Sequence, residues 1–339
     1  MTKRTKPSRR SKSSSTPCSR VLQAIRQGKS FLVTTHRSPD GDALGSALAL
    51  GYGLLKFKKK VKIYNFDPVP GNLKFLPGVD RVTQELHPEE RFDASFIVDC
   101  AERKRVGDTF LNHAGIGKLI ILDHHVIHGQ AGDIDMIETQ AASSGVVVLK
   151  VLQALKVPIT REIATHIYCT LVTDTGNFRY SNTDAGVLQL ASDLVKKGVN
   201  SSEIARHIYE SFPIERLRLM GRVLPTLEVS SDARYASLTL TQAMLQETGA
   251  TSDLADEFIN FPRSVDSVEV AVFFKESSEE ANTYKISLRS KQVVDVAAIA
   301  GLFDGGGHRR AAGCKITGDF ALIRKQVYQA VETALCKTS

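Results

Sequence analysis

Short apolar runs alternate with segments of helical periodicity over the first 190 residues or so, and this alternation limits the fold more than any other feature. Four runs of β-branched, aliphatic and aromatic residues predict strands at 31–35, 61–66, 94–98 and 118–122. Helices are predicted between and after them at 42–57, 144–155 and 161–172, the second capped by Ser143 or Ser144. Strands that alternate with helices in this way favour a mostly parallel sheet covered by helices.

The length of the chain calls for more than one hydrophobic core. At 339 residues it exceeds what a single core usually serves, so we expect two domains, the first at 20–197. The pattern changes near Val199, where two helical stretches separated by Pro213 predict a helical connector over 198–225. A smaller, mixed α/β domain is expected at 226–339, with strands at 236–240, 268–274 and 284–289 and a helix at 294–303.

The net charge of +7 belongs to the N-terminal segment rather than to the expected domains. The first twenty residues hold seven Lys and Arg and no acid, which leaves 37 basic against 37 acidic residues elsewhere. Because a segment rich in Ser, Thr and Pro cannot bury apolar area, we expect a disordered basic tail over 1–19. A weak phosphate-binding arm is the alternative, since basic segments attract polyanions.

Cysteine usage and hydropathy indicate the compartment. The five cysteines are odd in number, widely scattered and without a C-x-x-C pair, which predicts a reduced, cytoplasmic protein without zinc–thiolate sites. The N-terminal segment lacks the apolar stretch of a secretory signal. No apolar run reaches the roughly 18 residues of a membrane span, so we expect no membrane partner.

Acidic and imidazole side chains follow three of the predicted strands, at the point where each strand ends. In an open parallel sheet the carboxyl ends of the strands line the crevice in which ligands bind. We therefore expect these side chains to converge, together with one acid that follows the apolar segment IYCTLVT. The set comprises His36, Asp40, Asp42, Asp99, Asp123, His124, His125 and Asp174.

Acids crowded at one crevice repel one another, so a cation is needed to neutralise them. Carboxylates and imidazoles without thiolates suit Mn²⁺, Mg²⁺, Fe²⁺ or Co²⁺ rather than structural zinc. Asp40 and Asp42 alternate around Gly41 and can reach two different ions. Two ions about 3.5 to 4 Å apart activate water, hold phosphate oxygens and stabilise a leaving oxygen. Singly, an Asx turn would explain Asp40 to Asp42 and a helix N-cap would explain Asp99.

Taken together, the motifs resemble those of the DHH phosphoesterases, a family named for the triplet Asp123, His124 and His125. His36, Asp40 and Asp42 match the first motif, Asp99 in IVDC the second, the triplet the third, and Asp174 in TDTGNF the fourth. The segment GGGHRRAAG is similar to the signature of the DHH-associated C-terminal domain. The resemblance covers about residues 20–335 and points, within the family, to the nanoRNase and pAp phosphatase type.

The resemblance implies a role for each residue of the motifs. His36, Asp40 and Asp99 would hold one metal, and Asp42, Asp99, His124 and Asp174 the other, with Asp99 as the bridge. His125 would face the substrate phosphate, and Asp123 would orient an imidazole from outside the ligand shell. Asp99, Asp123 and His125 are thus the predicted catalytic residues.

For the C-terminal domain the resemblance implies a site for the substrate's terminal phosphate or nucleotide. Its predicted residues are Arg289, Gly305, Gly306, Gly307 and His308. A solvated strand position for the arginine and a flexible loop for the glycines are the alternatives. Arg105, six residues after Asp99, also matches a recurring arginine of the family, although a surface salt bridge explains it equally well.

The implied function is hydrolysis of short oligoribonucleotides (nanoRNA) to mononucleotides, of 3′-phosphoadenosine 5′-phosphate (pAp) to AMP, or of both. Two divalent cations, with Mn²⁺ favoured, would act in a cleft between a mostly parallel α/β domain and a smaller mixed α/β domain. The expected partners are short single-stranded oligoribonucleotides or nucleotides, and the question of a homodimer stays open.

Three other functions stay open. The first is a phosphodiesterase acting on cyclic or linear dinucleotides such as c-di-AMP and pApA. The second is a manganese-dependent pyrophosphatase, which would share the four metal motifs but carries a different basic motif in place of GGGH. The third is a non-enzymatic nucleic-acid-binding protein that uses the basic tail.

Overall fold

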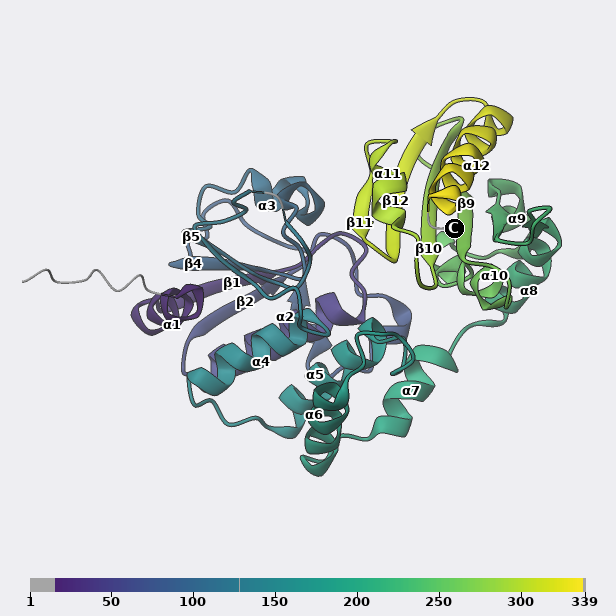
Figure 1. Ribbon diagram of the computed structural model, residues 1–339. Coiled ribbons are helices and arrows are strands. Elements are labelled where there is room, and N and C mark those ends of the chain that lie inside the picture. Colours follow the sequence, from purple (N-terminus) through teal and green to yellow (C-terminus); the bar gives the residue numbers. More distant parts are fainter. Residues whose placement is uncertain (1–15, 128, 338–339) are drawn as a thin grey trace, which may run out of the picture. The chain divides into compact units, whose positions relative to one another are not determined.

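The computed structural model of the protein describes residues 16–127 and 129–337 (Figure 1). The chain divides into two compact units, and the division falls between Glu210 and Ser211. This boundary lies inside the predicted connector, whose helix α7 (Ser201–Tyr209) belongs to the first unit and whose helix α8 (Ile214–Val223) belongs to the second. Residues 198–225 are therefore shared between the two units.

Most of the predicted tail lies outside the described residues. From Pro17 onward the chain is helical in α1 (Pro17–Gln27), so the prediction of disorder is wrong for residues 17–19. Thr16 caps this helix by accepting a hydrogen bond from the Ser19 N–H at 3.2 Å. Val21 and Ile25 are fully buried, so the helix is held by tertiary packing despite its polar start.

A six-stranded parallel sheet, ordered β3-β2-β1-β4-β5-β6, forms the centre of the first unit. Its strands are β1 (Ser30–Thr34), β2 (Lys60–Tyr64), β3 (Val82–Thr83), β4 (Ala94–Val98), β5 (Lys118–Asp123) and β6 (Ile134–Ile137). The four predicted strands and their parallel pairing are confirmed. The edge strands β3 and β6 were not predicted, because strands of two and four residues are too short for a periodic signal.

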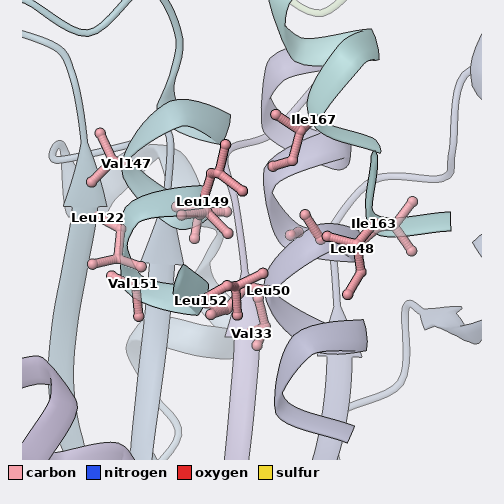
Figure 2. Packing of buried hydrophobic residues seen from close by; sticks show 14 of the residues in the cluster. Val33, Leu48, Leu50, Leu122, Val147, Leu149, Val151, Leu152, Ile163 and Ile167 are labelled. Carbon is pink, nitrogen blue, oxygen red and sulfur yellow. The ribbon is translucent and has the colours of Figure 1, made fainter. Parts of the chain in front are cut away.

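Side chains of the central strands alternate between two cores. Phe31 and Val33 of β1 lie in the larger core, whereas Leu32 lies in a smaller core on the opposite face with Val106 and Phe110. The larger core is closed by helices α2 (Gly41–Lys56), α4 (Ser144–Ala154) and α5 (Arg161–Asp174). Figure 2 shows residues of this core: Val33 and Leu122 from strands, Leu48 and Leu50 from α2, Val147, Leu149, Val151 and Leu152 from α4, and Ile163 and Ile167 from α5.

Two further helices and three turns complete the described part of the first unit. They are α3 (Asp108–Leu111), α6 (Ala185–Lys196) and the 3₁₀ turns η1 (Gly71–Leu73), η2 (Val79–Arg81) and η3 (Arg103–Val106). Helix α5 contacts α2, α4 and α6, so it lies in a second helical layer over the sheet. The sequence predicted α2, α4 and α5 to within two residues at either end.

The second unit contains a mixed sheet ordered β11-β12-β10-β9-β8-β7. Its strands are β7 (Glu228–Val229), β8 (Tyr235–Leu240), β9 (Val270–Glu276), β10 (Thr283–Ser290), β11 (Gly306–His308) and β12 (Ala311–Thr317). Only β8 and β9 pair in parallel. The expected mixed α/β architecture and its three predicted strands are confirmed.

Helices cover both faces of this second sheet. Val272 of β9 packs with α11 (Val296–Gly301) and α12 (Phe320–Cys336), while the neighbouring Phe273 packs on the other face with α8 and α9 (Gln242–Thr248). The same face carries α10 (Asn260–Ser264), and the turns η4 (Leu224–Thr226) and η5 (Ser252–Ala255) complete the unit. Helix α12 was not predicted, although its buried residues recur every four positions at Ile323, Val327, Val331 and Leu335.

Within the described ranges, no helix combines the length and the apolar character that crossing a membrane requires.

His166 of α5 gives the fold a titratable group that must stay neutral. The residue is fully buried, and its Nε2 donates a hydrogen bond to the Pro77 carbonyl oxygen at 2.9 Å. Its Nδ1 has no hydrogen-bond partner in the described part of the chain. A second proton would enter this buried position, so burial lowers the pKa of His166 to about 4.

We therefore expect stability to fall as the pH drops from about 6.5 towards 4, because the unfolded chain then binds a proton that the folded protein does not. The His166→Phe variant should lose less unfolding free energy than the wild type over this range, by about 3 kcal/mol. Denaturant titrations at a series of pH values measure the difference. His87→Gln, at a side chain that is 57 % exposed, is the control and should keep the wild-type dependence. If the unfolding free energies of the wild type and of His166→Phe changed equally with pH, the assignment of a neutral, buried His166 would be contradicted.

Candidate active site

The strand order of the first unit creates a point where the chain reverses its direction across the sheet. The chain runs outward from β1 to β2 and β3, and then returns to β4, which pairs with the other edge of β1. Ligands bind in the crevice outside the carboxyl ends of such strands. His36 lies two residues after β1, Asp99 directly after β4, and Asp123 is the last residue of β5. The predicted convergence at this edge is therefore what the topology produces.

A first cluster joins His36, Asp40 and Asp99, whose candidate ligand atoms all lie within 4.8 Å of one another. Nδ1 of His36 lies 2.7 Å from the Arg37 carbonyl oxygen, which only accepts, so Nδ1 carries the proton. The lone pair of Nε2 then faces Oδ2 of Asp99 at 3.6 Å. Asp40 caps α2 by accepting a hydrogen bond from the Ala43 N–H at 3.0 Å.

A second cluster joins Asp42, His124 and Asp174, again within 4.8 Å of one another. Nδ1 of His124 donates to the Ala141 carbonyl oxygen at 3.1 Å, which leaves the Nε2 lone pair directed at acids. This Nε2 lies 3.2 Å from Asp174 Oδ2, 3.7 Å from Asp42 Oδ2 and 3.8 Å from Asp99 Oδ1. A lone pair facing carboxylate oxygens is repulsive unless a cation lies between them, so the donor set fits a divalent ion.

Asp99 links the two clusters. One of its oxygens faces His36 and the other lies near His124, and its backbone adopts a left-handed φ of +55°. Such a conformation is strained for a residue with a side chain and is typical of functional sites. The residue is only 3 % exposed.

The start of helix α4 neutralises part of the charge on Asp42. This fully buried carboxylate accepts hydrogen bonds from the backbone N–H groups of Ser144 at 2.7 Å and Gly145 at 3.1 Å. The Ser46 hydroxyl donates to it at 3.1 Å. Amides at a helix N-terminus stabilise a negative charge, so the N-terminus of α4 stabilises the charged form of Asp42.

Ser144 also contacts the linking acid. Its hydroxyl donates to Asp99 Oδ1 at 2.9 Å and lies 3.4 Å from Asp123 Oδ1. The sequence predicted this serine only as an N-cap, and Ser143 is the N-cap residue of α4. The Ser143 hydroxyl pairs instead with the Thr170 hydroxyl at 2.8 Å. The paired serines ahead of α4 were visible in the sequence, but nothing there indicated their different partners.

Asp123 holds the second histidine of the triplet. Its Oδ1 accepts hydrogen bonds from Nδ1 of His125 at 2.7 Å and from the backbone N–H groups of His124 and His125 at 2.7 and 3.1 Å. The Nδ1 atom of His125 is therefore engaged within the triplet. The His125 side chain is 32 % exposed, whereas Asp123 is fully buried. The orienting role of Asp123 stays a prediction.

The acids of the two clusters raise one another's pKa. Burial raises the pKa of Asp42. Burial, together with the negative charges of Asp42, Asp40, Asp174 and Asp123, raises the pKa of Asp99 well above its ordinary value. Burial and the neighbouring acids do the same to the pKa of Asp174. Without cations, protons therefore compete for these sites.

The Asp123 and His125 pair behaves in the opposite way. Burial acts to raise the pKa of Asp123, but the hydrogen bond from His125 and the charge of that ring bring it below its ordinary value. Burial acts to lower the pKa of His125, but the hydrogen bond to Asp123 together with the negative charges of Asp123 and Asp42 raises it above its ordinary value. The pair thus favours a negative Asp123 and a positive His125.

Arg105 lies beside these residues, on the turn η3. Its carbonyl oxygen accepts a hydrogen bond from the Arg37 N–H at 2.7 Å, and its positive charge acts on the His125 imidazole. The side chain is exposed and is not in an ion pair in the described part of the chain. Its role in substrate binding stays a prediction.

The predicted residues of the second unit lie in one row of its sheet. Arg289 on β10 and His308 on β11 both pair with Ala311 on β12, so the two side chains point to the same face. Their backbones lie about 10 Å apart, two strand spacings. The fold brings these two residues together although nineteen positions separate them in the chain.

The three consecutive glycines predicted to bind substrate, Gly305 to Gly307, differ in how much space surrounds them. A Cβ on Gly305 would lie 2.3 Å from the Gly313 carbonyl oxygen, and one on Gly307, at a φ of +141°, 2.5 Å from the Ala311 carbonyl oxygen. A Cβ on Gly306 would meet nothing within 4 Å. The fold itself therefore requires Gly305 and Gly307, and only Gly306 has an open approach for a ligand.

Removing the Ser144 hydroxyl should weaken the binding of a divalent cation, because Asp99 then loses the group that orients it. For Ser144→Ala we expect the Kd for Mn²⁺ to rise about 10- to 100-fold, measured by titration calorimetry. Ser143→Ala is the matched control, since it removes a neighbouring buried hydroxyl that pairs with Thr170. Wild-type Mn²⁺ affinity in Ser144→Ala, or equal losses in both variants, would contradict this role.

Cation binding should stabilise the fold more at higher pH. The raised pKa values of Asp42, Asp99 and Asp174 mean that the metal-free folded protein holds protons more tightly than the unfolded chain. Their contribution to stability is present at low pH and is lost as the pH rises through the folded-state pKa. At about 100 times Kd, Mn²⁺ should add about 2.7 kcal/mol. Thermal melts with EDTA and with Mn²⁺ should therefore diverge as the pH is raised, and a gap that narrows with rising pH would refute the prediction.

Comparisons with known proteins agree with this geometry. A family model described as the DHH family N-terminal domain matches residues 30–171, and one described as the DHHA1 domain matches residues 235–334. The chain is 32 % identical to the bifunctional oligoribonuclease and PAP phosphatase NrnA of Thermus thermophilus, over 94 % of this chain and 93 % of that protein.

Solved structures share the fold. An exopolyphosphatase-related protein from Bacteroides fragilis superposes with a TM-score of 0.85 at 28 % identity, covering 94 % of this chain and 96 % of that one. RecJ of Thermus thermophilus in complex with Mn²⁺ has a TM-score of 0.50 at 15 % identity, covering 94 % of this chain and 54 % of that one. The resemblance predicted from the sequence motifs is confirmed: the chain belongs to the DHH family and is a phosphoesterase with a DHHA1 domain.

Proposed function

We propose that this protein hydrolyses short oligoribonucleotides to mononucleotides and pAp to AMP, with two divalent cations, of which Mn²⁺ is favoured. The observation that carries the proposal is the pair of ligand clusters joined through Asp99. The substrate class is supported by the name of the Thermus thermophilus relative, and the choice of Mn²⁺ by the ion in the RecJ complex.

The proposal assigns the ligands as the motifs predicted. His36, Asp40 and Asp99 would hold one cation, and Asp42, His124, Asp174 and Asp99 the other. When bound, the two cations would supply positive charge that activates water and neutralises the phosphate oxygens. The helix amides and the Ser144 hydroxyl would keep the carboxylates in place before substrate arrives.

His125 would contribute a proton at the substrate. Its Nδ1 is committed to Asp123 at 2.7 Å, and the raised pKa favours the protonated ring. In the protonated ring, Nε2–H would donate to a phosphate oxygen or to the leaving oxygen of the scissile bond. Asp123 itself would hold and polarise the ring without contacting the substrate.

Arg289, His308 and Gly306 are proposed to bind the terminal phosphate of the substrate. The arginine and histidine share one face of the second sheet, and the glycine backbone is open to approach. Gly305 and Gly307 would shape that strand, and Arg105 would add a positive charge near His125. A cytoplasmic location, a homodimer and cleavage of cyclic or linear dinucleotides stay predictions.

The test is a substrate panel with Mn²⁺: pAp, diribonucleotides, five-mers, pyrophosphate, c-di-AMP and pApA. We expect pAp and the short oligoribonucleotides to be cleaved, and Asp99→Ala to lose about 1,000-fold in kcat/KM, equivalent to about 4 kcal/mol. Asp193→Ala, at an exposed acid of α6, is the matched control and should keep wild-type rates. Cleavage of pyrophosphate alone, or of c-di-AMP alone, would reject this substrate assignment.

A further inference from the structure

We propose that Arg37 and Phe66 form a stacking platform for a nucleobase of the substrate, beside the metal-ligand clusters of the first unit. This inference rests on the proposed function and deepens it, because it names a part of the substrate that the cation clusters do not bind. Arg37 lies within the span of the first motif but is not one of its matched residues, and Phe66 lies outside all of the motifs.

Two hydrogen bonds, one with His36 and one with Arg105, hold the backbone of Arg37 in place. Arg37 comes directly after His36, whose Nδ1 donates to the Arg37 carbonyl oxygen at 2.7 Å. The Arg37 N–H in turn donates to the Arg105 carbonyl oxygen at 2.7 Å. Both backbone polar groups of Arg37 are therefore engaged, and its Cα lies about 3.8 Å from that of a proposed metal ligand.

The guanidinium group is stacked and partly exposed. Its central carbon lies 4.3 Å from the centroid of the Phe66 ring, and Nη2 lies 3.3 Å from Oδ2 of Asp108. The Arg37 side chain is nevertheless 42 % exposed. The phenyl ring thus covers one face of the guanidinium plane and Asp108 holds one edge, while part of the side chain stays exposed.

The surrounding backbone keeps the platform rigid. Gly107 has a φ of +102°, and a Cβ on it would lie 2.5 Å from the Phe66 ring, so only glycine allows the ring this position. Ser38 has a left-handed φ of +50°, and its N–H donates to Asp67 Oδ2 at 2.6 Å. Strain of this kind persists only where the surrounding structure enforces it, and it is concentrated at functional sites.

These contacts favour a nucleobase over a second phosphate. Asp108 already neutralises part of the guanidinium charge and would repel a nearby anion. A partly exposed guanidinium group suits a flat aromatic ring, because bases stack on arginine planes in RNA recognition. Phe66 on the far side prevents the arginine from turning away, which reduces the entropy lost when the base binds.

The test compares the loss of one base from the substrate, the loss of the Arg37 side chain from the protein, and the loss of both. Substrates are a diribonucleotide and two analogues in which one base or the other is replaced by hydrogen, assayed with Mn²⁺ for kcat/KM. For one of the two positions, loss of the base should cost the wild type about tenfold. Arg37→Ala should lose about tenfold on the intact dinucleotide and nothing further when that base is absent.

Two further variants separate stacking from charge. Arg37→Lys keeps the charge without the plane and should behave like Arg37→Ala. Arg103→Ala removes one charge from the neighbouring turn η3 and should keep the full wild-type response to base removal. Wild-type rates for Arg37→Lys would show that Arg37 acts through its charge and would overturn the stacking platform. The platform would also be overturned if removing the base lowered kcat/KM as much in Arg37→Ala as in the wild type. If the wild type cleaves no nucleotide at all, the proposed function fails and takes the platform with it.

Discussion

Buried like charges at one edge of a parallel sheet are the constraint on which the rest of this structure depends. Asp42, Asp99 and Asp123 are each at most 3 % exposed, and burial of several carboxylates is costly unless donors and cations offset it. The first turn of α4, a serine hydroxyl and the amides of the triplet supply the donors. These donors offset only part of the carboxylate charge, and the rest faces the lone pairs of two imidazoles. A pair of divalent cations would stabilise this arrangement.

The location of these charges is a consequence of strand order. β1 and β4 pair although about sixty residues separate them, because the chain first extends the sheet on one side and then returns. All strands of this sheet point the same way, so their carboxyl ends share one edge, and α2 and α4 begin there with N–H groups that have no partner within their own helix. The same edge therefore collects acids from the strands and the donors that hold them.

Much of the fold and of the candidate site followed from patterns within single segments. Strands such as 94–98 are continuous apolar runs, and an acid directly after such a run must lie at the edge of a parallel sheet. Ser144 and Arg37 escaped this reasoning, because their importance depends on contacts with Asp99 and Phe66, which lie 45 and 29 positions away. Helix α12 differs from these two residues, because its four-residue apolar repeat lies within a single segment and is visible in the sequence.

The sequence alone determined the two α/β units, the parallel sheet of the first, and the acids and imidazoles that meet at its edge, because each depends on local periodicity and on residue type. Tertiary structure alone decided which carboxylate faces which histidine, which of two adjacent serines binds Asp99, and where Arg37 lies. These choices depend on side-chain directions and on distances of 3 to 4 Å between segments far apart in the chain. No pattern within one segment encodes such distances, since they arise only when the sheet and its helices pack.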